Sequence, residues 1–183
     1  LYGTEAFTAY GIGVNILSIS IVIGMGFAIA TATMTGQNLG AGRPDEAEYA
    51  AWRNLKISFA TMAVIGLVLG ANARVIGGFF ISDPLVLDYL VALTIMVAVV
   101  QPMMSIEFTL GGALRGAGDT RSPARIMATG FLFGRVILTA VFYFLEMSVY
   151  WVYAALIADY IIKSSMYIVI FRRGDWKNAY SAA

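Results

Sequence analysis

The sequence contains five long runs of apolar residues, and these runs limit what the chain can fold into more than any other feature. Each run supplies the ~20 residues that an α-helix needs to cross the hydrocarbon core of a bilayer. None alternates apolar with polar residues, and all are far longer than the ~10 residues of a barrel strand. We therefore predict an all-α membrane protein with transmembrane helices at about residues 6–38, 55–80, 85–110, 124–145 and 149–171.

The composition agrees with a membrane location and argues against several functions. Hydrophobic residues make up 60% of the 183 residues and charged residues only 13%, which is too apolar for one soluble core. The net charge of +1 gives no reason to expect a nucleic-acid partner. The chain has no Cys and no His, which removes thiolate and imidazole chemistry and most transition-metal sites. We therefore expect no metal centre, no cofactor and no enzymatic activity, although a lipid-modifying membrane enzyme is an alternative.

Basic residues predict how the helices are oriented. They are concentrated in two connectors, 40–56 and 115–125, and in the carboxyl-terminal tail, whereas the alternate connectors, 82–84 and 146–150, carry none. The positive-inside rule then places the basic connectors and the carboxyl terminus in the cytoplasm. We expect a multi-pass protein of the plasma (inner) membrane, with Leu1 outside.

Two features concern the first part of the chain. The first apolar run is longer than a span requires, so its amino-terminal part is expected to be an external loop or the end of a preceding helix. The sequence starts at Leu1 without an initiator Met, and we expect the natural protein to extend upstream.

Pro44, followed by Asp45 and Glu46, is typical of a solvated helix start.

Small residues and one proline are expected to shape the helix packing. Three glycine pairs are spaced four residues apart: Gly36 and Gly40, Gly66 and Gly70, and Gly112 and Gly116. Such spacing lets helix backbones approach closely in lipid. Pro102 lies inside the third predicted helix, where it should produce a kink and free the carbonyl of Ala98.

Glu107, Arg135, Asp159 and Lys163 are the ionisable candidates for a site inside the predicted spans. Each costs about a few kcal/mol in a bilayer and usually faces an interior or a cavity. A helix rise of about 1.5 Å per residue places Glu107, Arg135 and Asp159 about 12, 15 and 19 Å from Arg115, Arg125 and Arg172, respectively. One interpretation is that Asp159–Lys163 and Glu107–Arg135 neutralise each other and hold the helices in register. The other is that Glu107 or Asp159 exchanges a proton for a cation, as an antiporter requires.

Neutral polar residues could line the same space. Asn15, Gln101, Thr109 and Tyr160 are the candidates, as ligands of a coupling cation or of a substrate. Hydrogen bonding between helices is the alternative role for each of them.

Two connectors and the tail carry a resemblance to a known family. The run GQNLGAGRP at residues 36–44 and the run GALRGAGDTRSP at residues 112–123 resemble the signature connectors of the MATE (multidrug and toxic compound extrusion) family. The ending FRRGDWK at residues 171–177 is similar to the family's carboxyl-terminal tail. Related connectors occur in both halves of such transporters, so the connectors do not distinguish the halves. The tail is the feature that identifies this segment with the carboxyl-terminal half.

The resemblance implies a twelve-helix, two-lobed transporter. The five helices would be the eighth to twelfth and form most of one six-helix bundle, with the amino-terminal bundle missing. Such a protein exports organic cations or other amphiphiles by alternating access, in exchange for Na⁺ or H⁺. Its partners would be a small amphiphilic or cationic substrate, membrane lipid and its own amino-terminal half. Some members place coupling acids on the seventh and tenth helices, and Glu107 lies on the tenth.

Two other functions remain open. Arg135 would suit a flippase of lipid-linked oligosaccharide or polysaccharide, because a basic residue in the cavity can face an anionic head group. A purely structural role for the buried charges predicts that neutralising Glu107 and Asp159 leaves transport intact.

Overall fold

The computed structural model describes residues 3–182, and all regular structure in that range is helical. The elements are α1 (Gly3–Gly40), α2 (Pro44–Ala71), α3 (Ala73–Gly78), α4 (Pro84–Gly116), α5 (Arg121–Thr129), η1 (Gly130–Ile137), α6 (Leu138–Phe144), α7 (Val149–Arg173) and η2 (Asp175–Ala182). Because α5, η1 and α6 follow one another without a break, they form one span, and five helices are long and apolar enough to cross a membrane. The prediction of an all-α membrane protein is confirmed.

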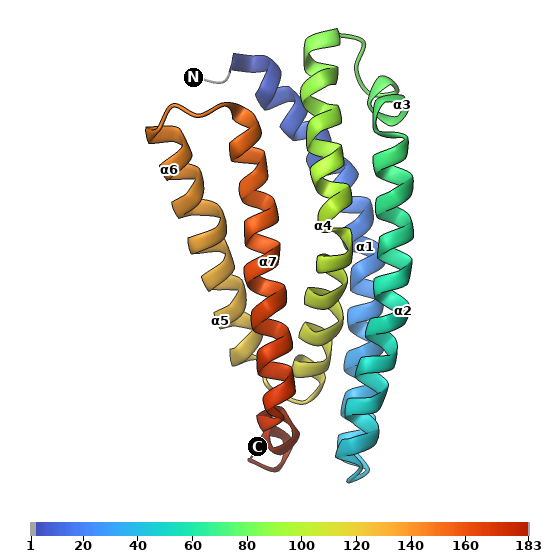
Figure 1. Ribbon diagram of the computed structural model, residues 1–183. Helices are drawn as coiled ribbons and strands as arrows, with labels where there is room; N and C mark the ends of the chain where they lie inside the picture. The colour runs from blue at the N-terminus through green and yellow to red at the C-terminus, as the bar shows by residue number, and fades with distance from the viewer. Residues whose placement is uncertain (1–2, 183) are drawn as a thin grey trace.

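The spans stand roughly side by side, with α4 near the middle (Figure 1). α4 packs against α1, α2 and α7, while η1 packs against α7 on the far side. Figure 1 shows α1 and α2 on one side of α4 and the pair formed by α7 and α5–α6 on the other. Residues of α4 therefore contact both groups of helices.

The helix α1 is one continuous helix from Gly3 to Gly40, so the prediction of a loop or a separate helix at its start is wrong. Its first turns are buried against other spans. Ala6 packs with Leu93 and Tyr153, and Ala9 packs with Leu90. The Tyr153 hydroxyl also donates a hydrogen bond of 2.9 Å to the Ala6 carbonyl. These contacts hold the amino-terminal turns in the helix.

The second span begins at Pro44 instead of residue 55 as predicted, because most of the polar connector is helical. Proline at the first helical position costs no hydrogen bond, and the acidic Asp45 and Glu46 favour the positive end of the helix dipole. Ala47 and Ala51 are fully buried, which anchors this polar first part. The predicted range 55–80 also ran past the end of α2 into the separate short helix α3.

Glycines set the closest helix contacts. A Cβ atom at Gly112 or Gly116 of α4 would collide with backbone atoms of Ala28 or Ala32 of α1. On the other side of α4, a Cβ atom at Gly66 of α2 would lie 2.5 Å from the carbonyl oxygen of Ala98. This is the carbonyl that Pro102 deprives of its usual donor, and α2 covers it at a position where only glycine fits.

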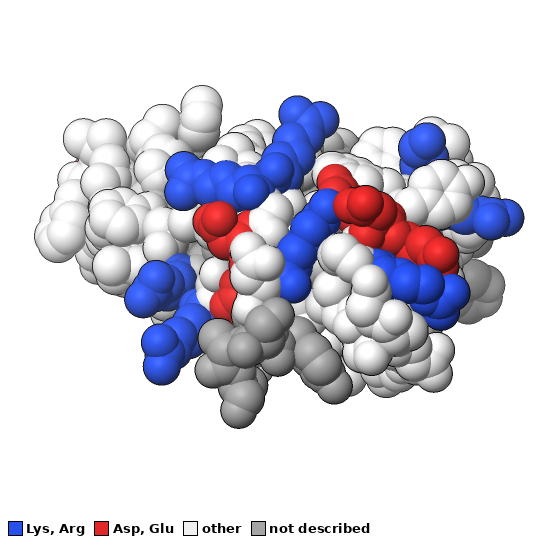
Figure 2. All heavy atoms as spheres, turned by 90° about the horizontal axis from the view of Figure 1, so that it is seen from below, with Lys and Arg blue, Asp and Glu red and all other residues white. Residues whose placement is uncertain are grey.

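The outside of the bundle is apolar over most of its length. Large exposed side chains occur on every span, among them Phe7, Ile19, Leu67, Phe131, Phe144 and Trp151. Exposed apolar surface on this scale is expected only where lipid or another protein covers it. The charged residues instead gather at the end that carries the carboxyl-terminal tail, where Lys and Arg alternate with Asp and Glu (Figure 2).

The carboxyl-terminal tail folds back against the bundle at this charged end. Trp176 of η2 is buried, stacks on Phe171 of α7 with ring centroids 4.7 Å apart, and donates a 2.9 Å hydrogen bond to the Phe171 carbonyl. Lys177 reaches α2, where its Nζ lies 3.1 Å from Asp45 Oδ1 and 2.6 Å from Glu48 Oε2. The tail therefore joins the end of α7 to the start of α2.

Candidate functional site

Four charged side chains from three elements meet inside the bundle, and we call Glu107, Arg135, Asp159 and Lys163 the charge cluster. Lys163 Nζ lies 3.0 Å from Asp159 Oδ2, one helical turn away on α7. The same nitrogen lies 3.8 Å from Glu107 Oε2 on α4. Arg135 of η1 approaches from the other side, with its terminal nitrogen 3.5 Å from Asp159 Oδ2. One lysine therefore bridges the two acids, and one acid lies between two cations.

The acids of the charge cluster are well shielded from solvent. The side chain of Asp159 is 0% exposed, that of Glu107 15% and that of Lys163 11%, whereas Arg135 remains 35% exposed. Charges buried this far are strongly destabilising when unpaired. Among the described residues, Asp159 Oδ1 has no hydrogen-bond partner. Glu107 Oε2 likewise accepts no hydrogen bond from the described residues, so the arrangement neutralises the charges and leaves one oxygen of each carboxylate without a donor.

The pairing differs in part from the first interpretation of the sequence. The Asp159–Lys163 pair forms, but the expected Glu107–Arg135 pair does not, because Arg135 is directed to Asp159 and Lys163 takes Glu107. The sequence places these residues at overlapping depths in the membrane. Which of them pair depends on the direction in which each side chain leaves its helix, and depth does not give that direction.

Two glycines that the sequence analysis did not consider allow Asp159 to be buried. A Cβ atom at Gly134 would lie 2.5 Å from the Cα of Asp159, and one at Gly130 would lie 2.8 Å from Asp159 Oδ1 and collide with the Lys163 stem. Both glycines belong to η1, a π-helical segment within the fourth span. Their spacing of four residues, the same as in the three pairs already noted, is the sequence signal that could have revealed them. A π-helical turn inside an α-helix is a frequent feature of functional sites.

The neutral candidates separate into two groups. The ring of Tyr160 is buried and lies 5.2 Å from Lys163 Nζ, which places it at the charge cluster. Gln101 is buried elsewhere on α4 and donates a 2.6 Å hydrogen bond to Ser20 of α1, so it joins helices. Asn15 is exposed on α1, and Thr109 is buried on α4.

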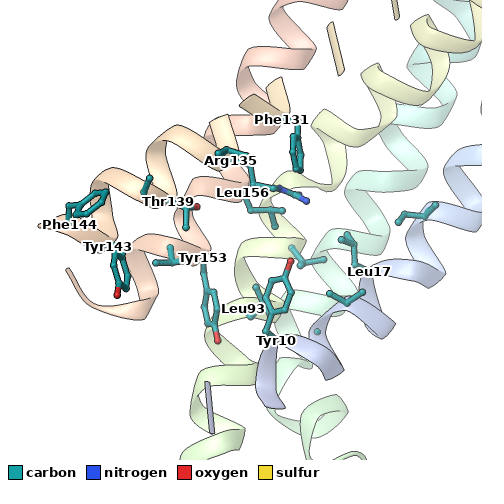
Figure 3. Close-up of a pocket in the computed structure, with 17 residues that line it drawn as sticks. Tyr10, Leu17, Leu93, Phe131, Arg135, Thr139, Tyr143, Phe144, Tyr153 and Leu156 are labelled. Atoms are coloured by element: carbon teal, nitrogen blue, oxygen red, sulfur yellow. The ribbon is translucent and has the colours of Figure 1, made fainter. Parts of the chain in front are cut away.

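An apolar cavity adjoins the charge cluster. Its volume is about 790 Å³, and residues of α1, α4, η1, α6 and α7 line it. Figure 3 shows Tyr10, Tyr153, Leu156 and Phe131 around it, with the Arg135 side chain extending among them. Arg135 therefore contacts both the cavity and Asp159, and it is the link between an apolar space and a buried acid.

Comparison with known proteins identifies the family. The family model described as MatE matches residues 1–141, which is more than half of the chain. The chain belongs to the MATE family. The resemblance of the two connectors is thereby confirmed.

Curated relatives of this MATE chain are longer proteins. The "Probable multidrug resistance protein NorM" of Thermotoga maritima is 25% identical over 177 residues, which are 96% of this chain and 38% of that protein. The protein of the same name from Brucella suis is 28% identical over 134 residues, which are 70% of this chain and 28% of that protein. The "Multidrug resistance protein PmpM" of Pseudomonas aeruginosa is 31% identical over 86 residues, 47% of this chain and 18% of that protein. The MATE chain thus spans less than two fifths of the length of each of these relatives.

Proposed function

We propose that this chain is the carboxyl-terminal bundle of a secondary active antiporter, which exports organic cations or drugs in exchange for Na⁺ or H⁺ by alternating access. The charge cluster is the observation that carries the proposal: a buried and a partly buried carboxylate on different helices share one lysine beside an apolar cavity. Ionisable residues inside membrane spans mark ion and proton pathways. The names of the curated relatives, which are multidrug resistance proteins, support drug export.

The geometry indicates how ion binding could be coupled to movement. Glu107 and Asp159 belong to α4 and α7, and Lys163 holds the two helices together electrostatically. A cation or a proton that neutralises Glu107 weakens its attraction to Lys163 and frees the two helices to shift relative to each other. The apolar cavity would accept an amphiphilic substrate, with membrane lipid around the bundle.

We infer that the protein lies in the inner membrane and that the end of the bundle with the carboxyl-terminal tail faces the cytoplasm. The basic residues at that end support the orientation. In the same proposal, the missing amino-terminal half supplies the second bundle, against which this one moves. We do not propose that the protein catalyses a covalent reaction.

The test uses the full-length protein in vesicles loaded with ethidium. Proton and sodium gradients are imposed separately on the wild type, on Glu107→Gln and on Asp159→Asn. We expect a gradient to drive efflux in the wild type and at least one substitution to abolish it while the protein remains inserted. Undiminished efflux in both variants would show that the charge cluster is structural.

A flippase for lipid-linked oligosaccharide is the second candidate, and the exposed part of Arg135 in the cavity favours it. An arginine there could bind the phosphate groups that such a lipid carries. Ethidium efflux by the wild type would count against this candidate. Movement of a fluorescent lipid-linked sugar that Arg135→Gln abolishes would support it.

A further inference from the structure

The charge cluster already contains as many fixed cations as acids. Glu107 and Asp159 face Lys163 and Arg135, so the cluster is electroneutral when all four groups are ionised. Inside a membrane protein, a further free cation would be repelled by both basic side chains at short range. The two acids therefore have little net attraction left for a metal ion.

Lys163 also occupies the place where such an ion would bind. Its Nζ lies between the two carboxylates, 3.0 Å from one and 3.8 Å from the other. Neighbouring residues limit how far the Lys163 side chain can move away from this position. Gly130 of η1 packs directly against its stem, and the Tyr160 ring lies 5.2 Å from the ammonium. The ammonium is a tethered cation in the position that would bridge α4 and α7.

A proton carries the same charge as a sodium ion, but it does not need the position that Lys163 occupies. It forms a covalent bond with a carboxylate oxygen and needs no shell of ligands, so it can bind while Lys163 stays near the other acid. The ionisable groups that interact electrostatically with Glu107 are Lys163, Asp159, Arg135, Arg115, Tyr160 and Tyr167. Of these only Asp159 is a second acid, and two of the three cations belong to the charge cluster.

We propose that Lys163 determines the ion selectivity of the transporter, because its ammonium takes the sodium position and leaves protons as the coupling ion. The inference rests on the proposed antiport function and narrows it from Na⁺ or H⁺ to H⁺. A proton taken up from the outer side neutralises one carboxylate, and its release on the inner side restores the pair with Lys163.

The first experiment measures ethidium transport by the full-length wild type in proteoliposomes. A proton gradient is imposed in sodium-free choline buffer, and a sodium gradient is imposed at equal pH on both sides. We expect the proton gradient to drive transport and the sodium gradient to leave it at the level of empty vesicles. Transport driven by sodium would contradict the inference of proton coupling but would still support the proposed antiport function. Transport driven by neither gradient would contradict the proposed antiport function itself.

The second experiment asks whether removing the tethered cation admits sodium. Thermal unfolding of the full-length protein in detergent is compared in NaCl and in choline chloride for the wild type, Lys163→Gln and Lys56→Gln. Lys56 is an exposed lysine and serves as the matched control. We expect sodium to raise the melting temperature of Lys163→Gln alone. A folded Lys163→Gln that does not respond to sodium, or a wild type that does, would contradict the proposal.

Discussion

At the scale of single residues, Asp159 is the group on which the charge cluster depends most. It accepts from Lys163 and contacts Arg135, and its side chain has no exposed surface. Removing one partner of such a buried pair typically costs about 3–5 kcal/mol, because the other charge stays buried without compensation. Removing both partners costs less than the sum, because the loss of the Asp159–Lys163 contact is then counted once, while Glu107 and Arg135 each lose a partner in either case.

This reasoning predicts strong coupling between Asp159 and Lys163 in a double-mutant cycle. We expect Asp159→Asn and Lys163→Gln to interact by about 0.5–3 kcal/mol, with the double variant more stable than additivity predicts. The free energies of unfolding are measured in mixed micelles for the wild type, both single variants and the double variant. Additive effects would mean that the 3.0 Å contact contributes little to stability.

The residues of the charge cluster could be predicted from the sequence, because ionisable residues inside apolar runs are rare. Their partners could not all be predicted. Counting along a helix gives depth, but an almost uniformly apolar helix gives no polar face from which to infer rotation. Arg135 was therefore matched with Glu107 and is directed to Asp159 instead. Asn15 illustrates the same limit, since it was expected near these residues and is exposed on α1.

At the scale of elements, η1 matters because its glycines let the fourth span approach α7 at Asp159. The sequence predicted the span but not its π-helical part, which depends on a close contact with a residue far along the chain. The start of α2 was missed for a related reason. Its polar first turns are held by burial of Ala47 and Ala51, and hydropathy alone does not report such contacts.

The contact at Gly134 predicts a specific loss of stability. We expect Gly134→Ala to cost about 1–3 kcal/mol, because the added methyl group meets the backbone of Asp159, which cannot rotate away. Gly26→Ala in α1 is the matched control, since nothing lies within 4 Å of the added atom. The control should be neutral or more stable by up to about 1 kcal/mol, as helix propensity favours alanine. Equal stability of the two variants in thermal unfolding would contradict the close approach.

The tail predicts a dependence on alkaline pH. Hydrogen bonds to Glu48 and Asp45 raise the pKa of Lys177 above its ordinary value. A raised lysine pKa stabilises the docked tail below the ordinary pKa, and this contribution is lost as the pH rises through the raised pKa. We therefore expect Trp176 to remain buried from neutral pH to the ordinary lysine range and to become exposed above it.

Fluorescence of Trp176 measures this docking in a variant whose other tryptophans, Trp52 and Trp151 among them, are replaced by phenylalanine. The same variant carrying Lys177→Gln is the control and should lack the alkaline transition. A transition that persists in the control would assign it to another group.

At the scale of the whole molecule, the charged end and the apolar sides define how the bundle lies in a membrane. The chain has no cysteine, so single cysteines can be introduced and labelled without removing native ones from this part of the protein. We expect an impermeant maleimide to label Ser82→Cys in intact cells and Asn178→Cys only after permeabilisation. Both positions are exposed; Ser82 belongs to the connector between α3 and α4 and Asn178 to η2, and these two segments lie at opposite ends of the bundle (Figure 1). The reverse labelling pattern would invert the proposed orientation.

The central claim is that the buried acids of this bundle couple substrate movement to ion movement. The most direct test is to add ethidium to vesicles that contain the full-length protein and to record the resulting proton flux with a pH-sensitive dye. Asp159→Asn is compared with Asp88→Asn, an exposed acid that pairs with Arg74 outside the charge cluster. The account predicts ethidium-driven proton flux in the wild type and in Asp88→Asn and none in Asp159→Asn; equal flux in the two variants would contradict it.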